Sequence, residues 1–416
     1  MTQVITRGNS FLEDDCNNST IDFNYYGEEV LLLYIHSFDF FELVILPIIA
    51  LVGLLANSCF LFVIWRIRTM RTNLNKYLSA LAVVDISLFV FGLSDRYLKR
   101  FSPIIFDNHS KIFGLAGCPF NLSIELTYYS SLMMVTLISL ERYYAVCKPL
   151  SHRTFVGGNR TRRQIIGAFA LAMFFVLLLI PYRGISRWSC VTYPQNGKYD
   201  HFPRKVILCF TDNEYIITVS QVIQALPFYT ALVASSFFYI RITHVLIQWE
   251  KKHPVKVSND VSYENETFAS ASSTAMTYCA SNDMVSSVPS ISSMAAAEDF
   301  GSKSSLYSKS STRSEMSITS QRMRKKSRAN QRAVTKMLLQ GGFVFFICNS
   351  PIQFYFTLSS ILRLFEVYIS VSGPIFTLFQ VLLYANSAIN PFIYGVTNAS
   401  YRAAFKKALL PWLKKA

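Results

Sequence analysis

An arginine stands near the end of one long apolar stretch of the sequence. Arg142 lies between Glu141 and Tyr143. An arginine side chain stays protonated at physiological pH, so it needs an acceptor wherever water is scarce. Glu141 is the carboxylate next to it in the sequence. We therefore expect Glu141 and Arg142 to pair in a resting state and to separate when the surrounding helices move apart.

Two further polar groups lie inside apolar stretches. Asp85 falls in one of them, and an ionised carboxylate at that depth in a membrane costs about 2.5–3.5 kcal/mol, so it needs partners. A later stretch carries Asn390-Pro391-Phe392-Ile393-Tyr394. Pro391 has no amide hydrogen and is expected to kink a helix, which leaves the part beyond it free to swing. We therefore expect movable polar parts within an apolar frame.

The frame consists of apolar stretches that are long enough to cross a membrane. Only 16% of the residues are charged, against about 25% in soluble domains, so lipid is the expected solvent. A span needs about 20 apolar residues. Seven stretches qualify, at about 42–66, 76–95, 119–140, 164–182, 215–247, 335–362 and 373–396. Because open sheets cannot cross hydrocarbon, each should be a helix, and the fold class is an all-α membrane protein, a seven-transmembrane helix bundle.

Lysines and arginines lie mainly at one side of the predicted spans. They follow spans one, three and seven and precede span six, so those ends should be cytoplasmic and the acidic N-terminal tail extracellular. The net charge is +15, but the basic residues lie next to the membrane and should face anionic lipid. We therefore expect contacts with membrane lipids and no binding to nucleic acid.

We expect the chain to divide into five segments. Residues 1–41 form an extracellular tail, 42–250 the first five spans with their loops, and 251–325 a disordered, serine-rich third cytoplasmic loop. Residues 326–396 form spans six and seven. Residues 397–416 form an amphipathic eighth helix and a short cytoplasmic tail, because apolar and basic residues alternate there. Glycosylation triplets on the outer side begin at Asn17, Asn18 and Asn108.

Four cysteines fall on the expected outer side, where disulfides form: Cys16, Cys118, Cys190 and Cys209. They allow three pairings, and the sequence does not choose among them. The segments that contain Cys190 and Cys209 flank a turn signal, Asn196-Gly197. This pattern predicts a β-hairpin between spans four and five, above the outer ends of the helices.

Together, the triplet at Arg142 and the Asn390-Pro391 motif resemble those of rhodopsin-like (class A) G-protein-coupled receptors, and neuropeptide receptors most. The resemblance covers nearly all of the chain outside the first forty residues and the serine-rich loop. It implies a plasma-membrane receptor that activates a heterotrimeric G protein, with receptor kinases and arrestin acting through the third cytoplasmic loop. It also implies a Cys118–Cys209 disulfide, which would leave Cys190 for Cys16. The implied switch residues are Glu141, Arg142, Tyr143, Pro351, Asn390, Pro391 and Tyr394.

The same resemblance supplies partners for Asp85. Receptors of this family hold a sodium ion in a polar cluster, and the matching positions here are Asn57, Asp85, Ser131, Asn386 and Asn390. Asp85 and Ser131 are the expected ligands of the ion, which would act as an allosteric regulator; no other cofactor is expected. The alternative is an uncharged network of hydrogen bonds.

The ligand class is predicted partly by exclusion. An opsin is excluded because Tyr384 stands where light receptors carry a lysine. Amine receptors carry an aspartate at the position of Ile124, although Glu125 beside it leaves an amine possible because Cys118 is one residue closer to Arg142 than usual.

Mixed charges and aromatic residues at the outer ends suit a short peptide. The ligand-binding candidates are Asp95, Arg96, Glu125, Arg183, Gln221, Gln224, Asn349 and Tyr355. We expect Arg96 and Arg183 to meet a carboxylate or carbonyl of the ligand and Glu125 to meet a cationic group. Asn349 replaces the tryptophan that the family usually has before Pro351.

Other function classes fit the sequence less well. Within the family, the alternative is a receptor for an amine or a lipid. A transporter or channel would use Asp85 for permeation, but it should show internal repeats and interrupted spans in matching halves, which the sequence lacks. An enzyme is not expected, because no nucleophile, base or metal cluster converges on either side of the predicted bundle.

Overall fold

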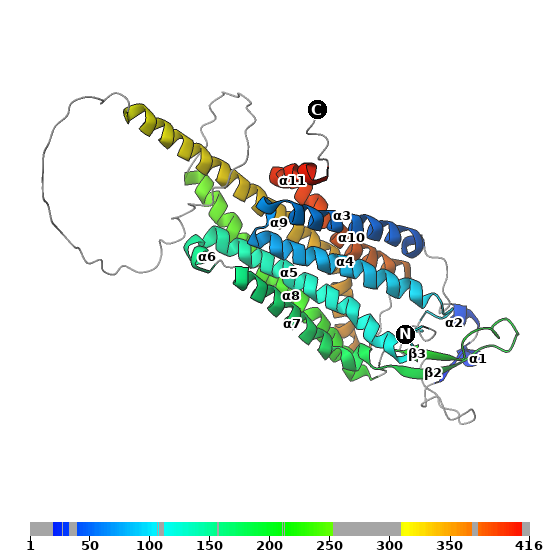
Figure 1. Ribbon diagram of the computed structural model, residues 1–416. Coiled ribbons are helices and arrows are strands. Elements are labelled where there is room, and N and C mark those ends of the chain that lie inside the picture. Colours follow the sequence, from blue (N-terminus) through cyan, green and yellow to red (C-terminus); the bar gives the residue numbers. More distant parts are fainter. Residues whose placement is uncertain are drawn as a thin grey trace, which may run out of the picture.

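The computed structural model describes residues 20–26, 28–32, 40–105, 107, 112–155, 158–209, 211, 213–252, 309–367 and 373–409. Seven long helices run side by side, with a small β-sheet at one end and the short helix α11 near the other (Figure 1). We call these two ends the sheet end and the α11 end. The long helices are α3 (Leu46–Arg66), α4 (Asn73–Lys99), α5 (Gly117–Cys147), α7 (Gly158–Leu178), α8 (Glu214–Lys252), α9 (Lys309–Arg363) and α10 (Gly373–Thr397).

Shorter elements join these helices. The one-turn elements are η2 (Phe41–Ile45), η3 (Arg68–Met70), η4 (Gly114–Ala116) and η5 (Ile180–Gly184), and α6 (Pro149–Phe155) follows α5. Helix α11 (Ala399–Leu409) follows α10 directly. Its buried Ala404 and Ala408 pack with Val63 of α3, while its basic residues are exposed. The predicted amphipathic eighth helix is therefore present.

All seven predicted spans are helical, but one of them is unlike the others. Among the described residues, six helices are long and apolar enough to span a membrane by length and composition, and α5 falls outside this set. Helix α5 carries Glu125, Glu141 and Arg142, and it packs against α4, α7, α8 and α9. Because it lies among other helices, less of its surface meets lipid, so it can hold more polar residues.

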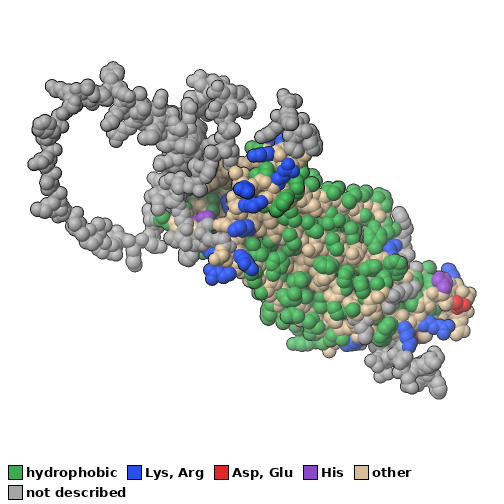
Figure 2. All heavy atoms as spheres, in the orientation of Figure 1, with side chains coloured by type: hydrophobic (Ala, Val, Ile, Leu, Met, Phe, Trp, Pro, Cys, Tyr) green, Lys and Arg blue, Asp and Glu red, His purple; other side chains and the backbone are tan. Residues whose placement is uncertain are grey.

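Apolar side chains cover the middle of the bundle on the face drawn in Figure 2, and basic side chains gather near the α11 end. Inside, the largest buried cluster joins α3, α4, α5, α8, α9 and α10 toward the α11 end, and includes Phe60, Tyr77, Leu132 and Phe228. Closer to the sheet end, α4 and α10 meet at Gly92. A Cβ atom there would lie 1.7 Å from the Tyr384 hydroxyl oxygen, so only glycine permits this approach.

The sheet has three strands in the order β1-β2-β3. Strand β2 (Arg187–Thr192) pairs antiparallel with β3 (Lys205–Leu208), and Gly197 in the connection has φ +74°. The predicted hairpin is therefore confirmed. Strand β1 (Thr20–Asp22) pairs parallel with β2 and is followed by α1 (Phe23–Tyr26) and α2 (Glu28–Leu32). The sequence had indicated only a tail there.

Part of the predicted cytoplasmic loop is helical. Helix α9 begins at Lys309, whereas the loop was expected to reach residue 325. The basic and other straight-chain residues before span six favour helix, and extending an existing helix needs no new nucleus. Residues 253–308 lie outside the described residues, so the predicted disorder stays a prediction.

Candidate functional site

Arg142 lies at the α11 end of α5, among side chains from three other helices. The phenol groups of Tyr239 on α8 and Tyr401 on α11 lie within electrostatic range of its guanidinium. Within the described part of the chain, the Arg142 Nε–H has no hydrogen-bond partner. Tyr239 donates a hydrogen bond of 3.1 Å to the Leu338 carbonyl, which ties α8 to α9 beside the arginine. The arginine is thus enclosed by side chains that would have to move before it could reach another protein.

The expected pairing of Glu141 with Arg142 is wrong in this structure. Glu141 instead forms an ion pair with His152 of α6, with 2.8 Å between the His152 Nε2 and the Glu141 Oε1. Neighbouring residues on a helix point in different directions, so adjacent positions are poorly placed to pair. Helix α6 begins at Pro149 and folds back far enough to bring the imidazole to the carboxylate. His152 was not predicted.

The Asn390-Pro391 motif lies in the half of α10 that leads to α11. Tyr394 is buried, and its ring lies 5.2 Å from that of Phe60 on α3 and 6.0 Å from that of Tyr401, measured between centroids. The Tyr401 hydroxyl donates a hydrogen bond to the Asn75 side chain on α4. A swing of α10 below Pro391 would have to separate these rings.

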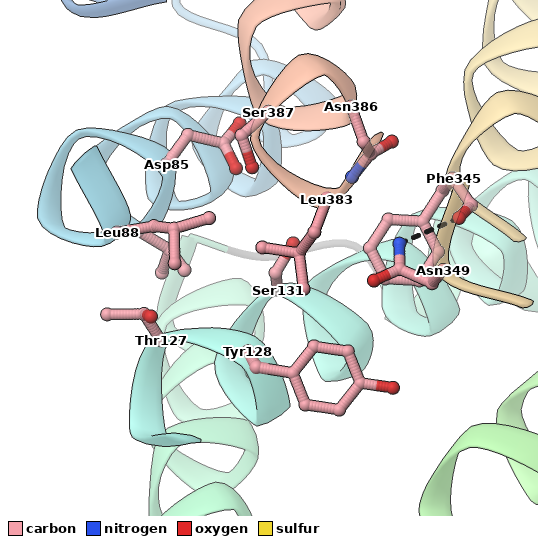
Figure 3. Close-up of a pocket in the computed structure, with 11 residues that line it drawn as sticks. Asp85, Leu88, Thr127, Tyr128, Ser131, Phe345, Asn349, Leu383, Asn386 and Ser387 are labelled. Atoms are coloured by element: carbon pink, nitrogen blue, oxygen red, sulfur yellow. Dashed lines mark hydrogen bonds between the residues drawn. The ribbon is translucent and has the colours of Figure 1, made fainter. Parts of the chain in front are cut away.

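A small internal cavity lies between α4, α5, α9 and α10 (Figure 3). Its volume of ≈ 10 Å³ is at the lower limit of what one water molecule requires. Three oxygen atoms in its lining have no hydrogen-bond partner among the described residues: Asp85 Oδ1, Ser131 Oγ and Asn386 Oδ1. Carboxylate, hydroxyl and amide oxygens are suitable ligands for a small hard cation. The residues present therefore fit the sodium ion that the sequence suggested.

The other two sodium-pocket candidates lie behind the lining. Asn390 donates a hydrogen bond of 3.0 Å to Asp85 Oδ2, and Asn57 donates one of the same length to the Ser387 carbonyl. They hold the lining residues in place and join α3, α4 and α10. Sequence reasoning missed Thr127, Tyr128 and Ser387 of the lining, because they belong to no motif.

Asn349 belongs to this cavity. It was predicted to contact the ligand, but it is buried in the cavity lining and donates a hydrogen bond of 2.7 Å to the Phe345 carbonyl one turn earlier. Ser350 makes the same kind of bond, 2.6 Å long, to the Phe346 carbonyl. Both bonds lie just before Pro351, which lacks a backbone donor, so α9 has its weakest backbone bonding at this point.

A second polar cluster lies nearer the sheet end. Arg183 Nη1 donates to Glu125 Oε1 at 2.7 Å, and Gln224 Nε2 lies 3.3 Å from both oxygens of that carboxylate. The Arg183 guanidinium also lies over the Tyr182 ring, 5.1 Å from its centroid. The side chains of Glu125 and Arg183 are 13% and 32% exposed, so the pair is only partly screened by water. Three predicted ligand-binding residues are thus together.

The remaining predicted ligand contacts have partners elsewhere. On α4, Asp95 pairs with Lys99 at 3.1 Å and Arg96 pairs with Glu42 at 3.7 Å. On α8, Gln221 accepts a hydrogen bond of 2.9 Å from Ser360 of α9. Tyr355 lies edge-to-face on Phe376 of α10, with 6.4 Å between the ring centroids. These residues surround the Glu125–Arg183 pair on other helices and do not contact it directly in the printed geometry of their ion pairs and hydrogen bonds.

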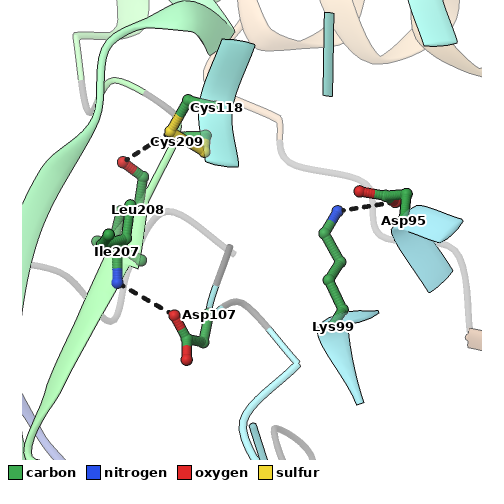
Figure 4. The surroundings of a disulfide bond; sticks show 7 residues. All are labelled: Asp95, Lys99, Asp107, Cys118, Ile207, Leu208 and Cys209. Atoms are coloured by element: carbon green, nitrogen blue, oxygen red, sulfur yellow. Dashed lines mark hydrogen bonds and ion pairs between the residues drawn. A yellow bond between two sulfur atoms is a disulfide. The ribbon is translucent and has the colours of Figure 1, made fainter. Parts of the chain in front are cut away.

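A disulfide joins the hairpin to the bundle (Figure 4). Cys118 at the start of α5 is bonded to Cys209, which follows β3, with an S–S distance of 2.00 Å. This confirms the pairing that the resemblance implied. Cys190 is also disulfide-bonded. Cys16, its expected partner, lies outside the described residues, as do Asn17, Asn18 and Asn108, so that pairing and the glycosylation sites stay predictions.

Comparison with known proteins identifies the family. The model for the 7 transmembrane receptor (rhodopsin family) matches residues 56–394. The chain belongs to this family. It is a multi-pass membrane receptor and not an enzyme.

The receptor is similar to proteins that recognise different ligands. The neuromedin U receptor homolog nmur-2 of Caenorhabditis elegans is 24% identical over 384 residues, which cover 87% of this chain and 77% of the relative. The 5-hydroxytryptamine receptor 1B of Cavia porcellus is 23% identical over 375 residues, covering 88% and 85%. The human motilin receptor is 37% identical over 125 residues, covering 29% and 28%.

Proposed function

We propose that the receptor binds an extracellular peptide at the sheet end and activates a heterotrimeric G protein at the α11 end. The N-terminus is then extracellular and the C-terminus cytoplasmic, in the plasma membrane. This orientation is supported by the basic side chains near the α11 end, which would face anionic lipid (Figure 2). The names of the similar neuromedin U and motilin receptors support a peptide.

The observation that carries the proposal is the Glu125–Arg183 pair with Gln224 beside it. A cationic group on a peptide would compete with Arg183 for Glu125. The released guanidinium could then bind a carbonyl or carboxylate of the same peptide, so both charges remain paired. A peptide offers both kinds of group on one backbone, and this is why we favour it.

The cluster is also connected to the parts that must move. Gln224 lies on α8, three residues before Pro227, and the outer halves of α8 and α9 are joined by Gln221–Ser360 and Tyr229–Thr357 hydrogen bonds. A ligand that displaces Gln224 would therefore act on α9. Motion of α9 about Pro351 would break the Tyr239 tether and open the space around Arg142. Only a ligand with higher affinity for the open arrangement would shift the population toward it.

Further partners follow from the same proposal. A sodium ion held by Asp85, Ser131 and Asn386 would bridge α4, α5 and α10 and so favour the closed arrangement. Receptor kinases and arrestin would act through the serine-rich segment between α8 and α9, where added phosphates would make the segment anionic.

A small amine is the second candidate ligand. Glu125 supplies a carboxylate for it, and the likeness to the 5-hydroxytryptamine receptor 1B supports it. A small amine, however, would displace Arg183 from Glu125 without giving that guanidinium a new acceptor, and this makes it the weaker candidate.

The test is a G-protein activation assay in transfected cells. Synthetic neuromedin U, motilin and a library of amidated and free-acid short peptides are applied, with serotonin as the amine probe and Arg142→Ala as the paired control. A peptide response that the control abolishes supports the proposal. A response to serotonin with silence across all peptides overturns the peptide assignment.

A further inference from the structure

A segment from the N-terminal end is built into the sheet. We call β1, α1 and α2 together the N-terminal layer. Strand β1 pairs with β2 in the register Thr20–Cys190, Ile21–Val191 and Asp22–Thr192. The Asp22 carboxylate also accepts a hydrogen bond of 2.6 Å from the Thr192 hydroxyl. The layer therefore has a fixed position on the hairpin.

The N-terminal layer shares an apolar core with the hairpin. The side chains of Phe23 and Leu31 are 0% exposed and lie in one cluster with residues of β2, β3 and the loop after α4. That cluster also includes Ile104, Val191, Tyr199, Val206 and Leu208. Phe23 stacks on Tyr193, with 6.3 Å between ring centroids. Burying two large apolar side chains stabilises an intramolecular contact by several kcal/mol, roughly 1.5–3 for each.

A polar contact holds the layer near the far end of the hairpin. Glu28 of α2 accepts hydrogen bonds from Lys198 at 2.7 Å and from the Tyr199 hydroxyl at 2.6 Å. These two bonds lower the pKa of the Glu28 carboxyl below its usual value, so it stays ionised. Lys198 follows Asn196-Gly197 in the connection between β2 and β3, so the contact lies at the turn.

The opposite end of the hairpin is attached to the helices. The Cys118–Cys209 disulfide fixes the end of β3 to α5, and the Ile207 amide donates a hydrogen bond of 3.2 Å to Asp107 (Figure 4). Cys118 lies on the same helix as Glu125, two turns closer to the sheet end. The hairpin is therefore held at its base by a covalent bond and at its turn by the N-terminal layer.

We propose that the N-terminal layer is a positioning element of the ligand site, which holds the hairpin where an incoming peptide must meet it. The inference rests on the proposed function, since it requires that the peptide enters at the sheet end. A hairpin attached only at its base would sample many positions. If about one tenth of them were competent for binding, the apparent affinity would fall about tenfold.

Leu31 and Leu32 provide a matched pair of substitutions. Leu31 is fully buried in the shared core, whereas Leu32 beside it is 54% exposed. Leu31→Asp places a charge in the core and should detach the layer, and Leu32→Asp adds the same charge at the surface. Both are made in the full chain and purified in lipid nanodiscs, and cell-surface levels are measured with a C-terminal tag. Phe23→Ser serves as a milder second variant if Leu31→Asp fails to reach the surface.

The first readout is hydrogen exchange without any ligand. The Val191 amide bonds to the Arg204 carbonyl on the β3 side, so the amides of Cys190 and Thr192 face the side where β1 lies. Exchange in residues 187–192 should be faster in Leu31→Asp and unchanged in Leu32→Asp. Equal exchange in both variants and in wild type would overturn the proposal, whatever the identity of the ligand.

The second readout is signalling by the most potent peptide of the library screen. Leu31→Asp should raise the concentration for half-maximal response about tenfold and leave the maximal response unchanged, because the helices that carry the response are intact. Faster exchange with unaltered potency would overturn the role in ligand binding. A receptor silent to every peptide would refute the proposed function, while the exchange experiment would still decide whether the layer holds the hairpin.

Discussion

Exchanging the two charges of the Glu125–Arg183 pair would separate their structural role from their role in ligand binding. Glu125→Arg alone would place two guanidinium groups where one ion pair of 2.7 Å now stands. The double variant Glu125→Arg/Arg183→Glu would restore an ion pair of reversed direction. Gln224 can serve either arrangement, because its side-chain amide both donates and accepts.

The expected magnitudes follow from the partial burial of the pair. A hydrogen bond to a charged group contributes about 1.5–3 kcal/mol, and the 13% exposure of the Glu125 side chain indicates that water would replace little of it. The single variant should therefore have a lower thermal midpoint in detergent. At about 1.4 kcal/mol per factor of ten, it should also lose about 10- to 100-fold in peptide potency.

The two variants should differ in a specific way. The double variant should regain the thermal midpoint of wild type, because the helices are again joined by opposite charges. Its peptide potency should stay low, because the cationic group of the peptide would now meet an arginine on α5. Ligand-free thermal melts and a G-protein activation assay with the same peptide measure the two quantities. If the double variant regains both stability and potency, Glu125 does not contact the ligand and our reasoning is refuted.

Three further predictions concern the interior of the bundle. Gly92→Ala should destabilise the purified receptor by about 1–3 kcal/mol, because its methyl group would collide with Tyr384, whereas Gly167→Ala, with open space around it, should be neutral or slightly stabilising in the same thermal melt. Asp85→Asn should make agonist affinity insensitive to replacing sodium by a large organic cation, while sodium should weaken agonist binding to wild type; a wild type that ignores sodium would contradict this. Tyr239→Phe removes a hydrogen bond of about 0.5–1.5 kcal/mol between α8 and α9 and should raise agonist-free signalling roughly 2- to 10-fold, and unchanged basal signalling at equal surface level would show that the tether does not restrain α9.

The sequence was sufficient for the helices because lipid imposes one simple requirement on them. Each span had to be long and apolar, and the seven stretches predicted on that ground match α3, α4, α5, α7, α8, α9 and α10. The requirement is weakest for α5, which is surrounded by other helices. The start of α9 at Lys309 was missed because a helix that continues into water needs only helix-forming residues and no apolar face.

Contacts between side chains were harder to predict. Adjacency in sequence suggested that Glu141 holds Arg142, but the carboxylate meets His152, which a short helix brings back to it. Strand β1 has three residues, too few for a recognisable pattern, and its partner is far away in the chain. In contrast, the grouping of Glu125 with Gln224 was predictable from helical spacing, since both were expected to face inward.

The position of β1 imposes an order on the assembly of the receptor. Asp22 and Thr192, which are joined in the sheet, are 170 residues apart in the chain. At about 5–20 residues per second, the ribosome needs about 10–30 s to make what lies between them. During that time the first strand has no partner, and Phe23 and Leu31 have no core to enter. The part of the chain that is synthesised first is therefore among the last to reach its final place, and enzymes that modify nascent chains can reach it until the hairpin emerges.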